Sequence, residues 1–354
     1  MSPPSVNPTC TVPAYSYPFW EKLVWPIQLL VPSTRNPLGI RPLTMPRGTL
    51  QGHVIGFVGD IMPLPHEVIA RVDDRVKAVL HGLNAVVCNL EAPVLDANTY
   101  QKPIKGLKLA FSRDLARRAL EALGTDPDRT YVCVANNHAA DYGPQQFRHT
   151  VDYLRSVGYQ VIGVWPKTVL LMEIGALRIG LVPWSYWMNL GWTAPCDSPR
   201  PVIRTDIMGL DLTQAKVAQK LDFIVGYSHW QFEYKHFPRS PFDQVAAQLA
   251  RAGMDVNVGG HPHVLGPLAS AGNSVVHYSL GNFVGLHPGW ANRLGGIMRL
   301  FLDSSAGGLT ASFDMIPTFM TKTDGSALVT SIDQLPGSVR EKCTQRLGLL
   351  YPGQ

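Results

Sequence analysis

Two histidines one residue apart follow directly on an apolar run, a pattern that suits metal chemistry. The segment GGHPHVLG, residues 259–266, comes after the strand-like run MDVNV. In extended backbone, residues i and i+2 point to the same face, and Pro262 biases His261 toward extended backbone, so His261 and His263 are predicted to project together. Two adjacent imidazoles can ligate one metal ion. The alternative is a polar loop with incidental histidines, and the pair alone does not decide between the two.

Acidic, amide and imidazole side chains also stand at the ends of other strand-like runs. These runs are VIGFVG, AVVCNL, YVCVAN and DFIVGYS. The polar residues that end or follow them are Asp60; Asn89 and Glu91; Asn137, His138 and Asp141; and His229, Trp230 and Glu233. Because ligands of open α/β sheets bind at the carboxyl ends of strands, these residues are expected to converge with the two histidines on one rim.

The elements that must position these residues alternate in type from residue 54 onward, which is typical of stacked βαβ units. Apolar β-rich runs predict strands over 54–59, 84–90, 130–136, 160–164, 222–228 and 254–259. Helical spacing predicts helices over 67–82, 113–124, 144–158 and 240–253. Residues 168–185 are predicted to form a hairpin that turns at Gly175-Ala176, and 274–284, 295–303 and 309–320 to add antiparallel strands.

The first fifty residues differ from the rest in being proline-rich. We interpret residues 1–50 as an irregular arm that wraps the domain or caps a site, and residues 51–354 as one domain. A membrane-surface role for the arm segment WEKLVWPIQLLV stays open, because its apolar residues are not clearly on one side. No apolar stretch reaches the roughly 20 residues needed to span a bilayer, and no secretory signal is recognised, so a cytoplasmic location is expected.

Composition narrows the class of protein. The chain is 45% hydrophobic and 16% charged, as in an ordinary globular protein, and its net charge of +5 is too mild and scattered to predict a nucleic-acid partner. A substrate that carries carboxylates would fit this charge. The five cysteines are odd in number and contain no C-x-x-C, so neither a disulfide framework nor a zinc ribbon is indicated, and a reducing compartment is expected. No pattern indicates an oligomeric state.

Six ordered motifs together resemble a known family. The segments GDIM, NLEAP, ANNHAADYG, HWQFEY, GGHPHV and YSLGNF lie between residues 54 and 300. Their order resembles the calcineurin-like metallophosphoesterases and, more closely, the CapA family named for poly-γ-glutamate capsule biosynthesis. The resemblance implies an α/β (α+β) fold, a four-layer sandwich of two central mixed β-sheets flanked by helices. It does not fix the reaction, because that family includes capsule proteins and metal-dependent peptide epimerases.

The resemblance also implies a metal site. Glu91, Asn137, His229 and His261 stand where the phosphoesterases keep a bridging carboxylate, an asparagine and two histidines around a metal ion. Such mixed oxygen and imidazole donors are compatible with Mn, Fe, Zn or, with added waters, Ca. The sequence does not choose among these ions.

Departures from the phosphoesterase pattern favour one tightly held metal and at most a weak second. Met62 stands where the first motif D-x-H has its histidine, and Ala139 replaces a residue that is usually acidic. Without a second ion, Asp60 and His263 are free to transfer protons beside the metal. His138, oriented by Asp141, is a second candidate for proton transfer; alternatively, Asp141 caps the following helix.

These residues predict a divalent-metal-dependent enzyme that acts on a peptide or poly-γ-glutamate-like substrate. Proton removal and return at Cα, as in epimerisation, would suit two acid–base groups beside a polarised carbonyl, and so would amide or ester hydrolysis. Further substrate contacts are predicted from Asn89, Trp230, Glu233, Asn282 and Arg293, against the alternatives of packing, turn or surface roles. The rival interpretations are a dinuclear phosphoesterase and a non-catalytic factor that binds an anionic polymer.

Overall fold

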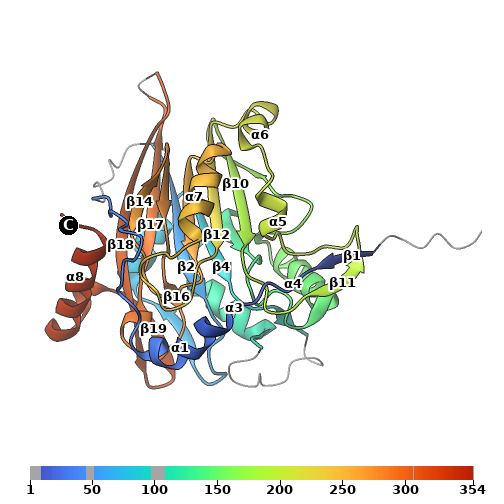
Figure 1. Cartoon of the computed structure of the whole chain (residues 1–354). Coiled ribbons are helices and arrows are strands. Elements are labelled where there is room, and N and C mark those ends of the chain that lie inside the picture. The colour runs from blue at the N-terminus through green and yellow to red at the C-terminus, as the bar shows by residue number, and fades with distance from the viewer. Residues whose placement is uncertain (1–8, 45–51, 97–107, 306, 354) are drawn as a thin grey trace, which may run out of the picture.

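Two β-sheets stacked face to face form the centre of the structure, a computed structural model that describes residues 9–44, 52–96, 108–305 and 307–353 (Figure 1). The larger sheet runs in the order β3 (Ile69–Val72), β19 (Ser326–Ser331), β18 (Thr310–Thr323), β17 (Leu294–Asp303), β2 (His53–Ile61), β4 (Ala85–Leu90), β7 (Thr130–Cys133) and β8 (Gln160–Ile162), with β16 (Asn282–Val284) beside β2. The smaller sheet runs in the order β14 (Leu268–Ala271), β15 (Ser274–His277), β13 (Val256–Gly260), β12 (Phe223–His229), β10 (Leu177–Ser185) and β9 (Leu170–Ile174).

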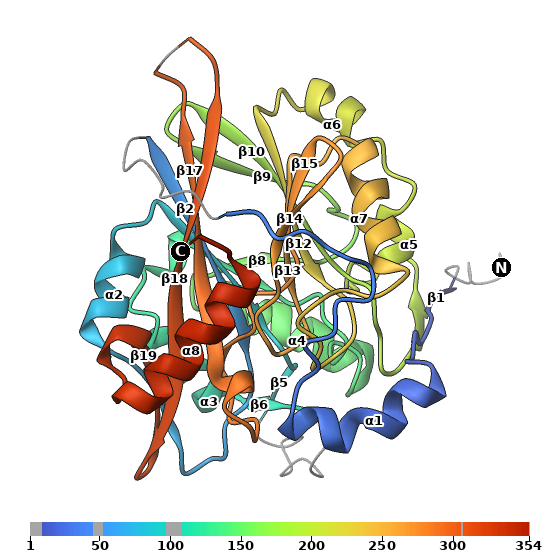
Figure 2. The ribbon, with the colours of Figure 1, turned by 60° about the vertical axis from the view of Figure 1, so that its left-hand side comes forward.

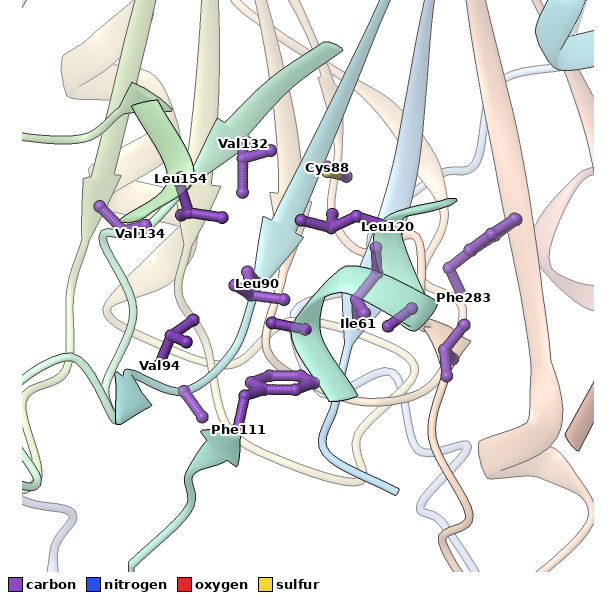
Figure 3. Packing of buried hydrophobic residues seen from close by; sticks show 14 of the residues in the cluster. Ile61, Cys88, Leu90, Val94, Phe111, Leu120, Val132, Val134, Leu154 and Phe283 are labelled. Atoms are coloured by element: carbon purple, nitrogen blue, oxygen red, sulfur yellow. The ribbon is translucent and has the colours of Figure 1, made fainter. Parts of the chain in front are cut away.

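Helices cover the outer face of each sheet, which completes the four predicted layers. The larger sheet is covered by α2 (Asp74–His81), α3 (Arg113–Glu121) and α4 (Gly143–Ser156), and the smaller one by α5 (Arg204–Ile207), α6 (Leu212–Ala218) and α7 (Phe242–Arg251). The period of two in β4 explains both faces: Val87 packs between the sheets, whereas Cys88 and Leu90 pack outward. Figure 3 shows this outer cluster, where Leu120 of α3 and Leu154 of α4 lie against the strand residues.

The predicted strands and the hairpin turn at Gly175 are present, but two predicted elements are wrong. Residues 67–82 were expected to be one helix, yet Val68, Ala70 and Val72 are buried with a period of two and residues 69–72 form β3. The helix begins only after Asp73, whose carboxylate accepts a hydrogen bond from the backbone of Val76 at 2.8 Å.

The segment 274–284 was expected to be one antiparallel strand, but it divides between the two sheets. Its first part, β15, runs parallel to β13, and its last part, β16, runs parallel to β2. The break falls at Gly281, which has a φ of +66°. Its carbonyl oxygen lies so close to Gly59 that a Cβ on residue 59 would be 2.1 Å from it. The crossing ties together the ends of strands from both sheets.

The N-terminal arm is more ordered than predicted. It contains β1 (Thr9–Val12), which pairs with β11 (Trp192–Pro195), and α1 (Phe19–Leu30). A disulfide joins Cys10 to Cys196, a pairing that the cysteine spacing did not indicate. The remaining cysteines, Cys88, Cys133 and Cys343, are free and buried. Among the described residues, no helix is both long and apolar enough to cross a membrane.

The C-terminal helix α8 (Gly337–Leu350) packs beside the two sheets and fixes a buried hydrogen-bond chain. The hydroxyl of Tyr351 donates to the carbonyl of Gly266 at 2.8 Å, so it accepts from Nε2 of His277, also at 2.8 Å. The other ring nitrogen of His277 is buried without a partner. His277 is therefore held neutral by its surroundings.

We predict that His277 makes the fold less stable in acid. Burial lowers the pKa of His277 in the folded state to about 3, whereas a histidine in an unfolded chain has a pKa of about 6.5. Between these two pH values the unfolded chain binds a proton that the folded chain does not. Stability is retained above the unfolded pKa and lost as the pH falls. In His277→Gln, the free energy of urea unfolding should fall less steeply with decreasing pH, by up to about 1.4 kcal/mol per pH unit. Equal slopes in His277→Gln, in wild type and in the exposed-site control His66→Gln would contradict the prediction.

Candidate metal centre and active site

The predicted site residues come together where strands from both sheets end. In the parallel pair of β2 and β4, Asp60 stands opposite Asn89, and in the pair of β12 and β13, His229 stands opposite Gly260. Parallel pairing places carboxyl ends at the same edge, so the loops that follow these strands share one site between the sheets. Asp60 and Glu91 are fully buried there.

The donor atoms of four predicted metal ligands converge around one nitrogen. Nε2 of His229 lies 2.9 Å from Oδ1 of Asn137, 3.0 Å from Nδ1 of His261 and 3.3 Å from Oε1 of Glu91. Ligand atoms about 2.0–2.2 Å from one ion lie roughly 3–3.5 Å from each other. Asn137, His261 and Glu91 therefore each lie from His229 at the spacing expected of two ligands of one ion.

Glu91 shows why this shell needs a cation. Both of its carboxylate oxygens are buried, and neither accepts a hydrogen bond, although His229 is near. Burial and the neighbouring charge of Asp60 raise the pKa of Glu91 to about 7. A buried carboxylate without donors is strongly unfavourable, and a bound divalent ion removes that penalty. The donor set therefore fits a divalent metal.

Two imidazoles near Glu91 are neutral, as metal ligands must be. The third, His229, differs: although burial opposes it, the charges of Glu91 and Asp60 raise its pKa to about 9, so a metal must displace its proton. Burial and the charge of His229 lower the pKa of His261 well below its usual value. Burial and His287 do the same for the pKa of His263. Neutral imidazoles offer a lone pair to a metal, whereas protonated ones do not.

Asp60 is satisfied by the protein, in contrast to Glu91. Its two oxygens accept hydrogen bonds from Nδ2 of Asn89 at 2.8 Å and from the backbone N–H of His261 at 2.9 Å. Although burial opposes ionisation, the hydrogen bond and charge of His229 hold the pKa of Asp60 below its usual range. Asp60 is thus an ionised anchor that positions Asn89 and His261, and proton transfer by Asp60 itself is not favoured by this geometry.

The backbone after β13 departs from the extended form predicted for it. His261 and His263 have φ values of +91° and +57°, in the left-handed region that non-glycine residues rarely adopt. This turn directs the N–H of His261 at Asp60, and the two rings still lie close, with centroids 5.9 Å apart. Gly260 allows the approach, because a Cβ there would lie 2.8 Å from a carboxylate oxygen of Asp60. Strain of this kind is retained where the surrounding structure holds it for function.

His138 and His263 line a cavity of about 500 Å³, which we call the main cavity. Nδ1 of His138 lies 2.7 Å from Oδ2 of Asp141, and Nδ1 of His263 lies 2.9 Å from Oδ1 of Asn282. Each partner oxygen accepts the Nδ1 proton, so in the neutral ring the lone pair is on Nε2. Nδ2 of Asn189 lies 3.4 Å from Nε2 of His138. Although burial opposes it, the hydrogen bond that His138 donates to Asp141 raises the pKa of His138. Asp141 does not act as the helix cap, since α4 is preceded by Tyr142.

The predicted substrate-binding residues fall into different places. Glu233 lines the main cavity, and burial together with Glu91 raises its pKa to about 8. Asn282 orients His263 rather than lining the cavity. The other three have different surroundings: Asn89 binds Asp60, Trp230 is buried in the core and stacked on Tyr278, and Arg293, in a short 3-10 helix, is not among the residues that line the main cavity.

The structure adds residues that the sequence did not indicate. Tyr17 of the arm is buried in the main cavity. Its hydroxyl contacts Nε2 of His261 and lies 3.5 Å from the carbonyl oxygen of Gln231. Because Nδ1 of His261 faces His229, this contact holds the ring in the tautomer that a ligand needs. His287 stacks on His263 with ring centroids 4.5 Å apart. No local signal marks Tyr17, since its contact joins residues 244 positions apart.

Comparisons with known proteins agree with the motif resemblance. A family model described as bacterial capsule synthesis protein PGA_cap matches residues 54–286. The capsule biosynthesis protein CapA of Bacillus anthracis is 26% identical over 295 residues, covering 78% of this chain and 70% of that protein. The PGA biosynthesis protein CapA of Bacillus subtilis (strain 168) is 29% identical over 251 residues, covering 66% of this chain and 63% of that protein, so this chain spans less than two thirds of that relative.

Two solved structures are among those similar to this one. A 5'-nucleotidase precursor from Thermus thermophilus has a TM-score of 0.44 and 15% identity, covering 84% of this chain and 58% of that chain. A hypothetical protein from the same organism has a TM-score of 0.42 and 14% identity, covering 75% of this chain and 99% of that chain. The family match begins after the arm, so Tyr17 lies outside it.

We predict that Glu91→Gln weakens metal binding while stabilising the metal-free protein. The variant loses a charged ligand, so affinity for Mn²⁺ should fall by more than roughly 100-fold, and it removes an uncompensated buried charge, so the metal-free protein should melt at a higher temperature. Titration calorimetry and thermal denaturation in chelator measure the two effects. Glu67→Gln, at an exposed carboxylate, is the control. Unchanged Mn²⁺ affinity in Glu91→Gln would exclude Glu91 as a ligand.

We also predict that Tyr17→Phe weakens Mn²⁺ binding by about tenfold, because His261 loses the acceptor that fixes its tautomer. Tyr15→Phe is the matched control, since Tyr15 belongs to the same arm and also lines the main cavity. The readout is the dissociation constant for Mn²⁺. If both variants bind Mn²⁺ as the wild type does, the arm has no part in the metal centre.

Proposed function

The chain belongs to the bacterial capsule synthesis protein PGA_cap family, and we propose that it is a divalent-metal-dependent acid–base enzyme acting on a peptide or poly-γ-glutamate-like chain. The observation that carries the proposal is the orphaned carboxylate of Glu91, which faces Asn137, His229 and His261 beside a cavity with two oriented histidines. One ion held by these four side chains is the expected cofactor, and its identity among Mn, Fe, Zn and Ca is not specified by the donors.

The metal, when bound, supplies a positive charge that polarises a substrate carbonyl or lowers the pKa of a water molecule. The protein supplies the groups that move protons. Nε2 of His138 faces the main cavity, with its ring oriented by Asp141 through a 2.7 Å hydrogen bond. Nε2 of His263 lies 3.7 Å from Glu91, with its ring oriented by Asn282.

These two histidines arise from different loops and differ in protonation. His263, whose pKa is lowered, can take a proton from the substrate, while His138, whose pKa is raised, can start protonated and return one. At a Cα next to a polarised carbonyl, this sequence amounts to epimerisation; at a water molecule and a leaving nitrogen, it amounts to amide hydrolysis. Asp60 does not exchange protons in either scheme, because both of its oxygens are occupied by donors from the protein.

The main cavity suits a chain that carries both apolar and acidic groups. Trp25, Leu29 and Trp187 give it apolar walls, and Lys22 offers an ammonium group at its edge. Glu233, with its pKa raised to about 8, is largely protonated near neutral pH and can donate a hydrogen bond to a carboxylate or carbonyl oxygen. These features support a peptide or polyglutamate-like substrate.

A dinuclear phosphoesterase is the second candidate, and one observation favours it. Two groups of potential ligands, Asp60 with Glu91 and His229, and Glu91 with His261 and His263, share Glu91. A shared carboxylate is the usual bridge between two metals. Two observations argue against it. Met62 lines the cavity at the position where the phosphoesterase motif has a histidine ligand for a second metal ion, and both oxygens of Asp60 already accept hydrogen bonds from the protein.

We predict that Asp141→Asn lowers turnover by at least about 100-fold while leaving the bound metal content unchanged, because His138 loses the partner that orients its ring. The assay follows γ-linked and α-linked glutamate oligomers in D₂O, in which deuterium uptake at Cα reports epimerisation and amine release reports hydrolysis. His149→Gln, at a histidine of α4 whose ring contacts the guanidinium group of Arg113, is the control.

The same assays discriminate the alternatives. Hydrolysis of an aryl phosphate with two metals per chain would favour the phosphoesterase. Tight oligomer binding without deuterium uptake, amine release or phosphate release would favour a non-catalytic polymer-binding factor. Full turnover in Asp141→Asn would exclude the proposed role of His138.

A further inference from the structure

Helix α1 carries an apolar face that nothing in the described chain covers. It consists of Phe19, Trp20, Leu23, Val24, Ile27, Leu30 and the adjoining Val31, which are 36% to 72% exposed. At 100° per residue these positions fall within an arc of about 140° along one side of the helix. We call this set the outer face of α1. Its size and continuity exceed what scattered surface residues account for.

Positive charges flank the outer face on both sides. Lys22 is exposed on one flank. On the other flank lies a groove of about 340 Å³, the cationic groove, in which Trp20 and Val24 meet Arg35, Lys235 and Arg239. Among the described residues that line it, the acidic one is Glu21, which forms an ion pair with Lys235. Arg35 is exposed, and Nε of Arg239 is buried without a hydrogen-bond partner. The flanks therefore carry a net positive charge.

We propose that α1 binds the surface of a bilayer that contains anionic lipids, with its outer face in the acyl boundary and the cationic groove on lipid phosphates. An apolar stripe with Trp and Phe, bordered by Lys and Arg, is the pattern of helices that lie in the membrane interface rather than span it. A second copy of this chain fits less well, because two such faces would bring their cationic flanks together. The sequence left this role open, and the structure places all the apolar residues of the outer face on one side.

The proposed orientation connects the bilayer to the catalytic cavity. The opposite side of the same helix lines the main cavity with Trp25 and Leu29, and Lys22 stands at its edge. In Figure 2, α1 lies at the lower edge of the molecule, at the opposite end from α6. Binding through α1 therefore places the main cavity directly behind this helix, at the membrane-proximal end of the molecule, and α6 at the far end. The proposal does not depend on which reaction the site performs.

Vesicle sedimentation of the full chain tests the proposal. We expect binding to vesicles of phosphatidylcholine with phosphatidylglycerol, weaker binding to phosphatidylcholine alone, and loss of the difference at high salt. Lys22→Gln combined with Arg35→Gln should weaken binding to the anionic vesicles about 30-fold, at a factor of about five per cation. Leu23→Asp combined with Ile27→Asp should abolish binding to both kinds of vesicle.

The control is Val217→Asp on α6, an equally exposed apolar site outside the proposed surface, which should bind as the wild type does. Circular dichroism and the Mn²⁺ dissociation constant show that each variant keeps its fold. Absence of vesicle binding by the wild type, or equal binding by all variants, would overturn the proposal. A dimer in light scattering that dissociates in Leu23→Asp, without vesicle binding, would overturn it in favour of a second copy of the chain.

Discussion

A single buried carboxylate sets the requirements for the whole site. Glu91 is fully buried at the end of a central strand, with no hydrogen-bond donor on either oxygen. The protein surrounds it with one amide oxygen and three imidazoles. His261 and His263 are neutral, and although burial opposes it, the nearby carboxylates raise the pKa of His229 to about 9. A divalent cation bound here would displace that proton and take over the compensation of the negative charge. Asp60, a short distance away, has the opposite surroundings: two donors from the protein satisfy it. The contrast between these carboxylates is what separates a metal ligand from a positioning residue.

The two-sheet sandwich brings these groups together at one edge, although they lie far apart in the sequence. Strands β2 and β4 of the larger sheet and β12 and β13 of the smaller one deliver their ends to the same edge. The crossing at Gly281 joins the two sheets at that edge, and Gly260 lets the backbone approach Asp60. Replacing either glycine by a residue with a side chain would push the strand ends apart. The geometry of the metal centre therefore depends on the close packing of the two sheets.

Much of this arrangement could be predicted from sequence, because apolar runs with a period of two locate buried strands and the polar residues at their ends locate a rim. The convergence of Glu91, Asn137, His229 and His261 follows from that logic, whereas the four layers were implied by the resemblance of the motifs to a known family. Local patterns do not report contacts between distant segments, so Tyr17 and the Cys10–Cys196 disulfide were missed. The strand β3 was hidden because its residues also fit a helical spacing, and the left-handed backbone of His261 is imposed by its hydrogen bond to Asp60.

The central claim is that Glu91, Asn137, His229 and His261 together hold a divalent cation. Anomalous diffraction from crystals grown with Mn²⁺, recorded at the manganese absorption edge, tests it most directly. The account predicts one strong peak about 2.0–2.3 Å from donor atoms of all four side chains. A peak elsewhere, or a structure in which Glu91 instead accepts hydrogen bonds from protein donors and no manganese lies beside it, would contradict the account.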